Sequence, residues 1–145
     1  MSLLHHIVLA STAISLLLPA STAAQWTQEV GFDDSDMALD LTEAESFQKY
    51  PTYDQYLQMM QGFASDYPAI CRLDTFGTSE EGRLLLALKI SNNVEADEAE
   101  ASFLYTSTMH GDEVVGYVLL LRLADSLLTG YGNDPEVTTL VNNLS

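Results

Sequence analysis

The chain has 145 residues, with 21 acidic and five basic side chains and a formal net charge of −16 at pH 7. Such an anionic protein lacks the clustered lysines and arginines that bind nucleic acid or anionic lipid, so neither is an expected partner. The one cysteine, Cys71, cannot form a disulfide bond within the chain, and its apolar surroundings predict a small buried side chain.

The first 24 residues have the pattern of a secretory signal peptide. An apolar region at 7–18 is followed by Pro19 and small residues, so the mature chain is expected to begin at Ala24 or Gln25. The alternative is an uncleaved membrane anchor, but about 12 apolar residues are short for the roughly 20 of a spanning helix. The pattern therefore predicts a secreted or periplasmic protein whose mature part forms one small domain.

Residues 25–49 are rich in acids, have no clean apolar period and are predicted to be a loosely held N-terminal extension. A helix is predicted over 50–68, because Thr52 and Gln55 have the spacing of a capping box and Pro68 ends the pattern. Its stripe of tyrosine, methionine and phenylalanine side chains, which includes Tyr53, is interpreted as core packing.

Two strands are predicted at 69–77 and 84–91, joined as an antiparallel hairpin by the turn 78–83. An acidic loop follows at 92–101. The segment 102–108 is apolar enough to predict a third strand that is buried on both faces.

The last part of the chain predicts two helices. The first, at 114–129, is apolar nearly all round and is expected to pack on a sheet and under further cover. The second begins after Asp134 as the N-cap, with Pro135 at its first position. These elements need more apolar partners than the chain supplies. The predicted fold is therefore the first part of an α/β domain whose later strands are missing.

His110 and Glu113 stand at the junction between the predicted third strand and the helix at 114–129. Ligands of open α/β sheets bind outside the carboxyl ends of the strands. An imidazole and a carboxylate are both good zinc ligands, so this pair could supply two of the three protein ligands of a catalytic zinc. Alternatively, Asp112 and Glu113 only stabilise a helix N-terminus, by about 0.3–1 kcal/mol, and His110 is a polar surface residue.

Arg83 follows Gly82 in the polar turn of the hairpin. Its guanidinium could grip a carbonyl or carboxylate group through two parallel hydrogen bonds. The alternative is a solvated turn residue that pairs with Glu80 or Glu81.

Three segments together resemble the zinc carboxypeptidase family of the carboxypeptidase A type, in order and in spacing. They are the helix "YPTYDQYLQMMQGFASDYP", the turn and strand "GTSEEGRLLLALKIS" and the stretch "FLYTSTMHGDEVVGYVLLLRLADSLLTGYG". The second contains a Gly-x-Ser-x-Glu-Gly-Arg turn and the third a His-x-x-Glu segment. The resemblance covers residues 50–145, which would be the N-terminal part of a catalytic domain. It implies a partial three-layer α/β/α sandwich with a mixed sheet, truncated after the first strands and helices.

The resemblance implies that His110 and Glu113 are zinc ligands and that Arg83 contacts the substrate backbone. It also implies that Zn²⁺ activates a water molecule to cleave the C-terminal residue from peptides or proteins. The family's third zinc ligand, general base and carboxylate-gripping residues lie further along, so no catalytic residue is assigned here and the chain alone is expected to be inactive. The oligomeric state and side-chain preference stay open.

Two other functions remain open. One is a related zinc hydrolase that acts on acylated amino acids, which the peptide-subsite turn ending at Arg83 disfavours. The other is a secreted binding domain that kept the fold and lost the catalytic site.

Overall fold

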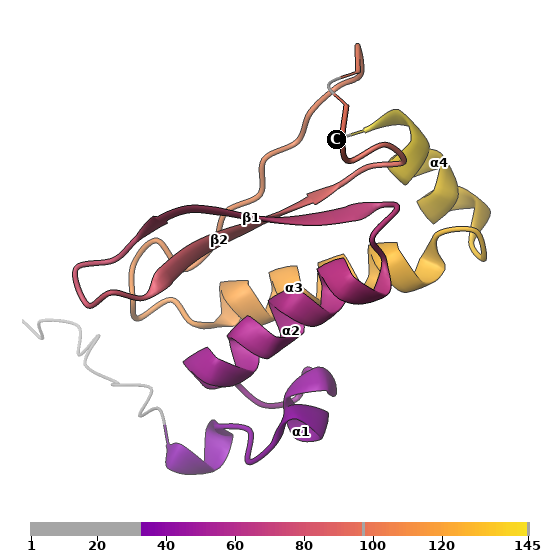
Figure 1. Cartoon of the computed structure of the whole chain (residues 1–145). Helices are drawn as coiled ribbons and strands as arrows, with labels where there is room; N and C mark the ends of the chain where they lie inside the picture. Colours follow the sequence, from indigo (N-terminus) through magenta and orange to yellow (C-terminus); the bar gives the residue numbers. More distant parts are fainter. Residues whose placement is uncertain (1–32, 97, 145) are drawn as a thin grey trace, which may run out of the picture. The chain divides into compact units, whose positions relative to one another are not determined.

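The computed structural model describes residues 33–96 and 98–144, and the predicted leader at 1–24 lies outside them. The elements follow the chain in the order η1 (Asp34–Asp36), α1 (Leu41–Glu45), α2 (Tyr53–Asp66), β1 (Cys71–Thr78), β2 (Leu84–Ile90), α3 (Val115–Gly130) and α4 (Pro135–Asn143) (Figure 1). No helix among the described residues combines the length and the apolar character that crossing a bilayer requires.

Helix α2 begins where the capping box predicts. The backbone N–H of Gln55 donates to Thr52 Oγ1 at 3.3 Å, and the N–H of Thr52 donates to Gln55 Oε1 at 2.7 Å. These two bonds satisfy N–H groups that the first helical turn leaves without partners. The helix ends at Asp66, with Tyr67 as its C-cap directly before Pro68. The predicted helix at 50–68 is therefore confirmed.

Strands β1 and β2 form the predicted antiparallel hairpin, in which Cys71 pairs with Ile90 and Leu73 with Leu88. The register shifts between Thr75 and Gly77, as in a β-bulge. Within the described residues this hairpin is the whole sheet. The α/β class is confirmed, and the described sheet is antiparallel.

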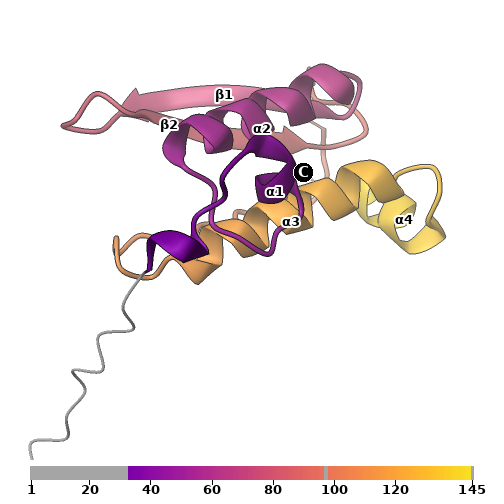
Figure 2. The same ribbon diagram turned by 90° about the horizontal axis from the view of Figure 1, so that it is seen from below.

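The core lies between one face of the hairpin and helices α2 and α3. Figures 1 and 2 show α2 running along the hairpin with α3 beside it. Alternate residues of a strand point to the same face, so Cys71 and Leu73 of β1 meet Leu86, Leu88 and Ile90 of β2 over the helices. The buried residues of this cluster are Ala38, Ala44, Met59, Met60, Phe63, Ile70, Cys71, Leu121, Ala124 and Leu128.

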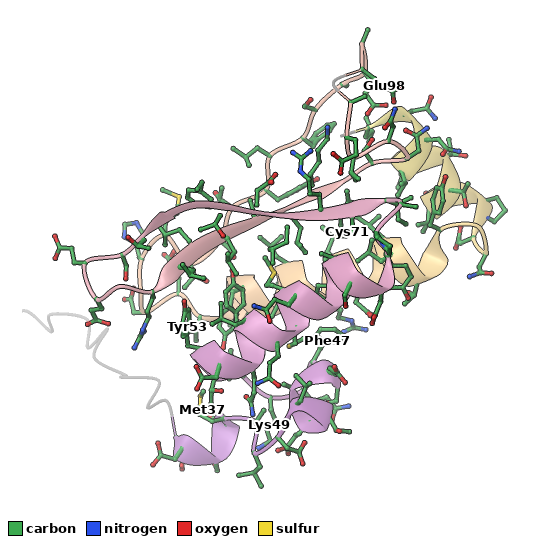
Figure 3. All side chains as sticks on the ribbon, viewed as in Figure 1. Met37, Phe47, Lys49, Tyr53, Cys71 and Glu98 are labelled. Carbon is green, nitrogen blue, oxygen red and sulfur yellow. The ribbon has the colours of Figure 1, made fainter. Side chains whose placement is uncertain are left out.

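Cys71 lies at the start of β1, only 2% exposed, above helix α2 (Figure 3). Burial disfavours the thiolate and raises the pKa of Cys71 to about 11. We expect the native thiol to resist a disulfide reagent at pH 8 and to react quickly once the chain is unfolded in urea. Equal reaction rates with and without urea would show that Cys71 is accessible.

The raised pKa of Cys71 also makes the free energy of unfolding depend on pH. The thiol of the unfolded chain ionises near its ordinary pKa and the native thiol near 11, so the free energy of unfolding falls as the pH rises between these two values.

The prediction of a loosely held extension is wrong for residues 33–48. Ala38 and Ala44 are buried in the core, and the carbonyl oxygen of Ala38 accepts a hydrogen bond from Gln55 Nε2 at 3.2 Å. The N–H of Ala38 donates to the carbonyl of Tyr50 at 2.9 Å. Small buried side chains and hydrogen bonds of the main chain hold this segment, and neither produces an apolar period in the sequence.

The prediction of a buried strand at 102–108 is also wrong. The segment forms no strand, and Phe103, Leu104 and Tyr105 are 63%, 88% and 65% exposed. A buried strand needs neighbours that take up its hydrogen bonds and cover its side chains. Ala101, directly before this segment, forms an isolated parallel β-bridge with Leu144, and no strand of the described residues pairs with the segment itself. The apolar side chains of this segment are therefore exposed, because no described strand lies beside it to cover them.

Helices α3 and α4 form as predicted. Asp134 caps α4 by accepting hydrogen bonds from the N–H groups of Glu136 and Val137 at 2.8 and 3.2 Å. The expectation that α3 lies under further cover is wrong for one stripe, because Val115, Leu119 and Leu123 are exposed. These residues are four apart and therefore share one face of the helix.

Candidate metal and substrate site

His110 and Glu113 lie in the short turn that leads into α3. The N–H of Glu113 donates to the carbonyl oxygen of His110 at 3.0 Å, which closes a single turn around Gly111 and Asp112. Both side chains are exposed. The sequence therefore places an imidazole and a carboxylate at the two ends of one hydrogen-bonded turn, reachable from solvent.

Two further features fix the backbone of this turn. Thr108 has a positive φ of 55°, which a threonine rarely adopts, and its hydroxyl donates to the carbonyl of Glu113 at 3.0 Å. Gly116 lies so close to Ser107 that a Cβ on the glycine would stand 2.8 Å from the Cβ of Ser107. The first turn of α3 can therefore pack against residue 107 only because residue 116 has no side chain.

Replacing Gly116 by alanine should destabilise the chain by about 1–3 kcal/mol, because the new methyl group must displace Ser107 and the turn beside it. Gly62 is the matched control, since it lies inside α2 and a Cβ added there would meet nothing within 4 Å. Gly62→Ala should stabilise the chain by about 0.5–1 kcal/mol through helix propensity. Urea unfolding measures both, and equal effects of the two changes would contradict the close approach at Gly116.

The donor types at this turn suit zinc, which binds histidine nitrogen and carboxylate oxygen. Within residues 33–96 and 98–144, however, no three histidine, cysteine or acidic side chains come together as a metal site. His110 and Glu113 thus fit two positions of a zinc site, and a third protein ligand is not among the described residues.

Arg83 ends the turn between β1 and β2. The N–H of Ser79 donates to the carbonyl of Arg83 at 2.8 Å, and the N–H of Arg83 donates to Ser79 Oγ at 3.2 Å. Gly82 has a positive φ of 76°, which glycine adopts without strain. Arg83 Nη2 lies 3.5 Å from Glu81 Oε2, and both side chains are largely exposed. An ion pair in water is weak, so it leaves the guanidinium available to another partner.

Tyr53 touches the same turn from the first position of α2. Its hydroxyl oxygen accepts a hydrogen bond from the N–H of Leu84 at 2.6 Å, and the Arg83 guanidinium carbon lies 5.4 Å from the centre of its ring. The helical pattern placed Tyr53 in the core stripe and did not indicate this contact. The one signal in the sequence is its position as the first residue of the helix, before the residues of the stripe that are buried.

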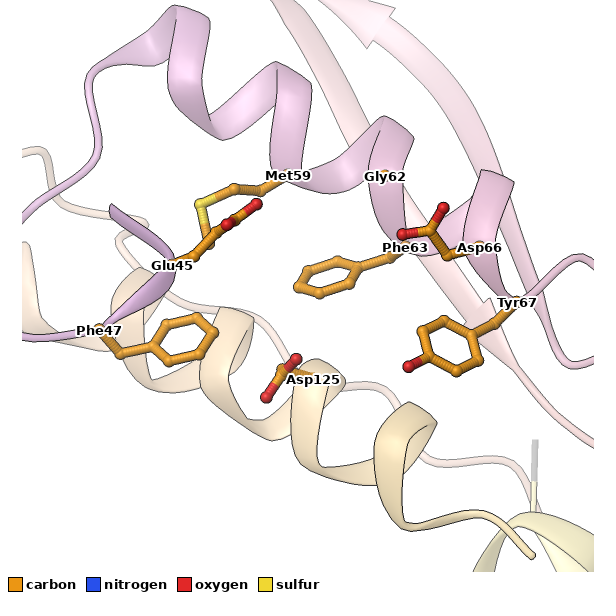
Figure 4. A pocket seen from close by; sticks show the side chains of 8 residues that line it. All are labelled: Glu45, Phe47, Met59, Gly62, Phe63, Asp66, Tyr67 and Asp125. Atoms are coloured by element: carbon orange, nitrogen blue, oxygen red, sulfur yellow. The ribbon is translucent and has the colours of Figure 1, made fainter. Parts of the chain in front are cut away.

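The hairpin turn that ends at Arg83 and the segment that leads into α3 lie at the same end of the described domain, at the left in Figures 1 and 2. A pocket of about 210 Å³ lies elsewhere, between α1, α2 and α3 (Figure 4). Its walls are Glu45, Phe47, Met59, Gly62, Phe63, Asp66, Tyr67 and Asp125. Arg83, His110 and Glu113 are therefore exposed at this end of the domain and do not line the pocket.

The sequence matches known carboxypeptidases over the part that carries these residues. The zinc carboxypeptidase family model matches residues 56–145. Carboxypeptidase D of Homo sapiens is 47% identical over 85 residues, which are 58% of this chain and 6% of that protein. Carboxypeptidase SOL1 of Arabidopsis thaliana is 38% identical over 95 residues, or 66% of this chain and 19% of that protein.

The fold also matches a solved structure. The crystal structure of thrombin activatable fibrinolysis inhibitor superposes with a TM-score of 0.64 at 18% identity, over 77% of this chain and 28% of that chain. The chain thus spans between 6% and 28% of the length of these three proteins. The family model covers more than half of the chain, including Arg83, His110 and Glu113, and on this ground the chain belongs to the zinc carboxypeptidase family.

Proposed function

We propose that the whole protein is a secreted or periplasmic zinc carboxypeptidase, which removes C-terminal residues from peptides or proteins. The observation that carries this proposal is the hydrogen-bonded His110–Glu113 turn, which lies within the residues that match the family. A bound zinc ion would polarise the scissile carbonyl and lower the pKa of its water ligand toward about 7.

The residues of this chain have separate tasks in that reaction. His110 would hold the zinc ion through a ring nitrogen and Glu113 through its carboxylate, and the backbone turn sets the spacing between the two residues. Arg83 donates hydrogen bonds to the main chain of the peptide and so orients it across the site. This contact is expected to bind the substrate and the transition state equally, so it lowers KM and leaves kcat unchanged.

The general base and the third zinc ligand are proposed to lie outside this chain. The 145-residue chain alone is therefore expected to hydrolyse no peptide. Peptidase activity from the purified chain, in a preparation that a chelator inhibits, would contradict this part of the proposal.

The whole protein is tested with a pair of peptides that differ only at the C-terminus. We expect release of the last residue from the peptide with a free carboxylate, no release from its amidated twin, and loss of activity with a zinc chelator. Hydrolysis of N-acyl amino acids but not of peptides would favour the related zinc hydrolase. Peptide binding without cleavage would favour a binding domain.

A further inference from the structure

Tyr53 makes two contacts with the turn that carries Arg83, one through its ring and one through its hydroxyl group. The ring centre lies 5.4 Å from the guanidinium carbon, within the distance at which a cation is attracted to an aromatic face. The hydroxyl oxygen accepts the N–H of Leu84, the residue directly after Arg83, at 2.6 Å. Figure 3 shows Tyr53 at the N-terminal end of α2, toward the hairpin turn.

Without these contacts, Arg83 would be poorly positioned. Its side chain is long and largely exposed, it follows a glycine, and the ion pair with Glu81 holds its head weakly. Tyr53 itself is held well, because it is part of a capped helix and its ring centre lies 6.3 Å from that of Tyr56. A fixed aromatic side chain therefore restrains a long and flexible one.

We propose that Tyr53 is a positioning residue, which presets Arg83 for binding the main chain of the substrate. The ring restrains the direction of the guanidinium, and the hydroxyl ties the first residue of β2 to α2. The inference rests on the role proposed above for Arg83. The new point is that part of the affinity for the peptide comes from α2, which belongs neither to the hairpin turn nor to the His110–Glu113 turn.

The test is a double-mutant cycle in the whole protein. The variants are Tyr53→Leu, Arg83→Ala and both together, assayed on a peptide long enough to reach Arg83 and on the shortest N-acylated dipeptide substrate. Tyr53→Leu should raise KM for the longer peptide about three- to ten-fold with kcat unchanged, as expected when a contact binds ground state and transition state alike. The short substrate should be unaffected, and Tyr53→Leu should have no further effect once Arg83 is alanine.

Two further variants keep the test decisive. Tyr53→Phe retains the ring and removes only the hydroxyl, so it should raise KM by a smaller factor even if the leucine variant folds poorly. Tyr56→Phe changes the neighbouring tyrosine, whose ring contact in the described part of the chain is with Tyr53, and it should leave KM unchanged.

The ways in which this test can fail are distinguishable. If Tyr53→Leu raises KM by the same factor with and without Arg83, Tyr53 does not act through the arginine and only this inference is overturned. If Arg83→Ala leaves KM for the longer peptide unchanged, the role of Arg83 is wrong and the inference is overturned with it. If the whole protein cleaves no peptide, the proposed function fails and both are abandoned.

Discussion

Changing Glu113 to glutamine should remove zinc from the whole protein and abolish nearly all of its peptidase activity. The substitution keeps the size of the side chain but replaces a charged carboxylate by a neutral amide, which is a poor zinc ligand. Changes to residues that merely support a ligand lower metal affinity by about 10- to 100-fold, so loss of a direct ligand should cost at least about 100-fold. Zinc per chain, measured by mass spectrometry after dialysis, and peptide turnover report the two effects.

Asp112→Asn is the matched control for this result. Asp112 is the preceding residue, is likewise exposed and loses the same unit of charge, but no metal or substrate role is assigned to it. The control variant should keep zinc and activity close to those of the unchanged protein. If both variants lose zinc equally, negative charge at the start of α3 matters, and a specific ligand at position 113 does not explain the site.

Truncation of Leu128 to alanine should cost about 2–5 kcal/mol of unfolding free energy, the largest stability effect that we expect from a single change. Leu128 is 1% exposed and lies in the cluster that joins α3 to α2 and the hairpin. The change removes buried methyl groups and leaves a cavity that the surrounding side chains cannot fully close. Small domains have total stabilities of about 5–15 kcal/mol, so urea unfolding at a moderate temperature should show a large shift of the midpoint.

Leu119→Ala is the matched control, because it makes the same chemical change on the exposed face of α3 instead of the buried face. Leu119 is 58% exposed on the uncovered stripe, so its truncation should alter stability by no more than about 0.5 kcal/mol. A loss at Leu119 as large as the loss at Leu128 would mean that the exposed stripe is covered in solution.

Local signals were sufficient for most of the elements. Thr52 and Gln55 predicted the start of α2 because capping depends on residues three apart, and Asp134 with Pro135 predicted the start of α4 for the same reason. The hairpin followed from two apolar runs around a polar turn. In each case the residues that decide the structure are neighbours in the sequence.

The failures have a different cause. The segment 102–108 has the composition of a buried strand, but strand formation depends on partner strands, which its own sequence cannot supply. Residues 33–48 lack an apolar period and are nevertheless held, because burial of Ala38 and Ala44 depends on the shape of the helices they pack against. Both outcomes depend on tertiary contacts that override local composition.

The residues of the candidate site show the same difference between local signals and tertiary contacts. His110 and Glu113 are joined by one turn, so their spacing in the sequence indicated that they could act together. The contact between Tyr53 and Arg83 joins residues far apart in the chain, from a helix and a hairpin turn, and no short motif contains both. Sequence reasoning therefore proposed the metal-binding pair, which stays a prediction, and missed the residue that contacts the arginine.

A crystal structure of the whole protein, with anomalous diffraction data at the zinc absorption edge, would locate the metal and its ligands in one experiment. If His110 and Glu113 bind the catalytic zinc, one strong peak should lie about 2.0–2.2 Å from a ring nitrogen of His110 and from a carboxylate oxygen of Glu113. A zinc peak bound by other residues, or side chains of His110 and Glu113 that point away from each other with no metal between them, would contradict this assignment.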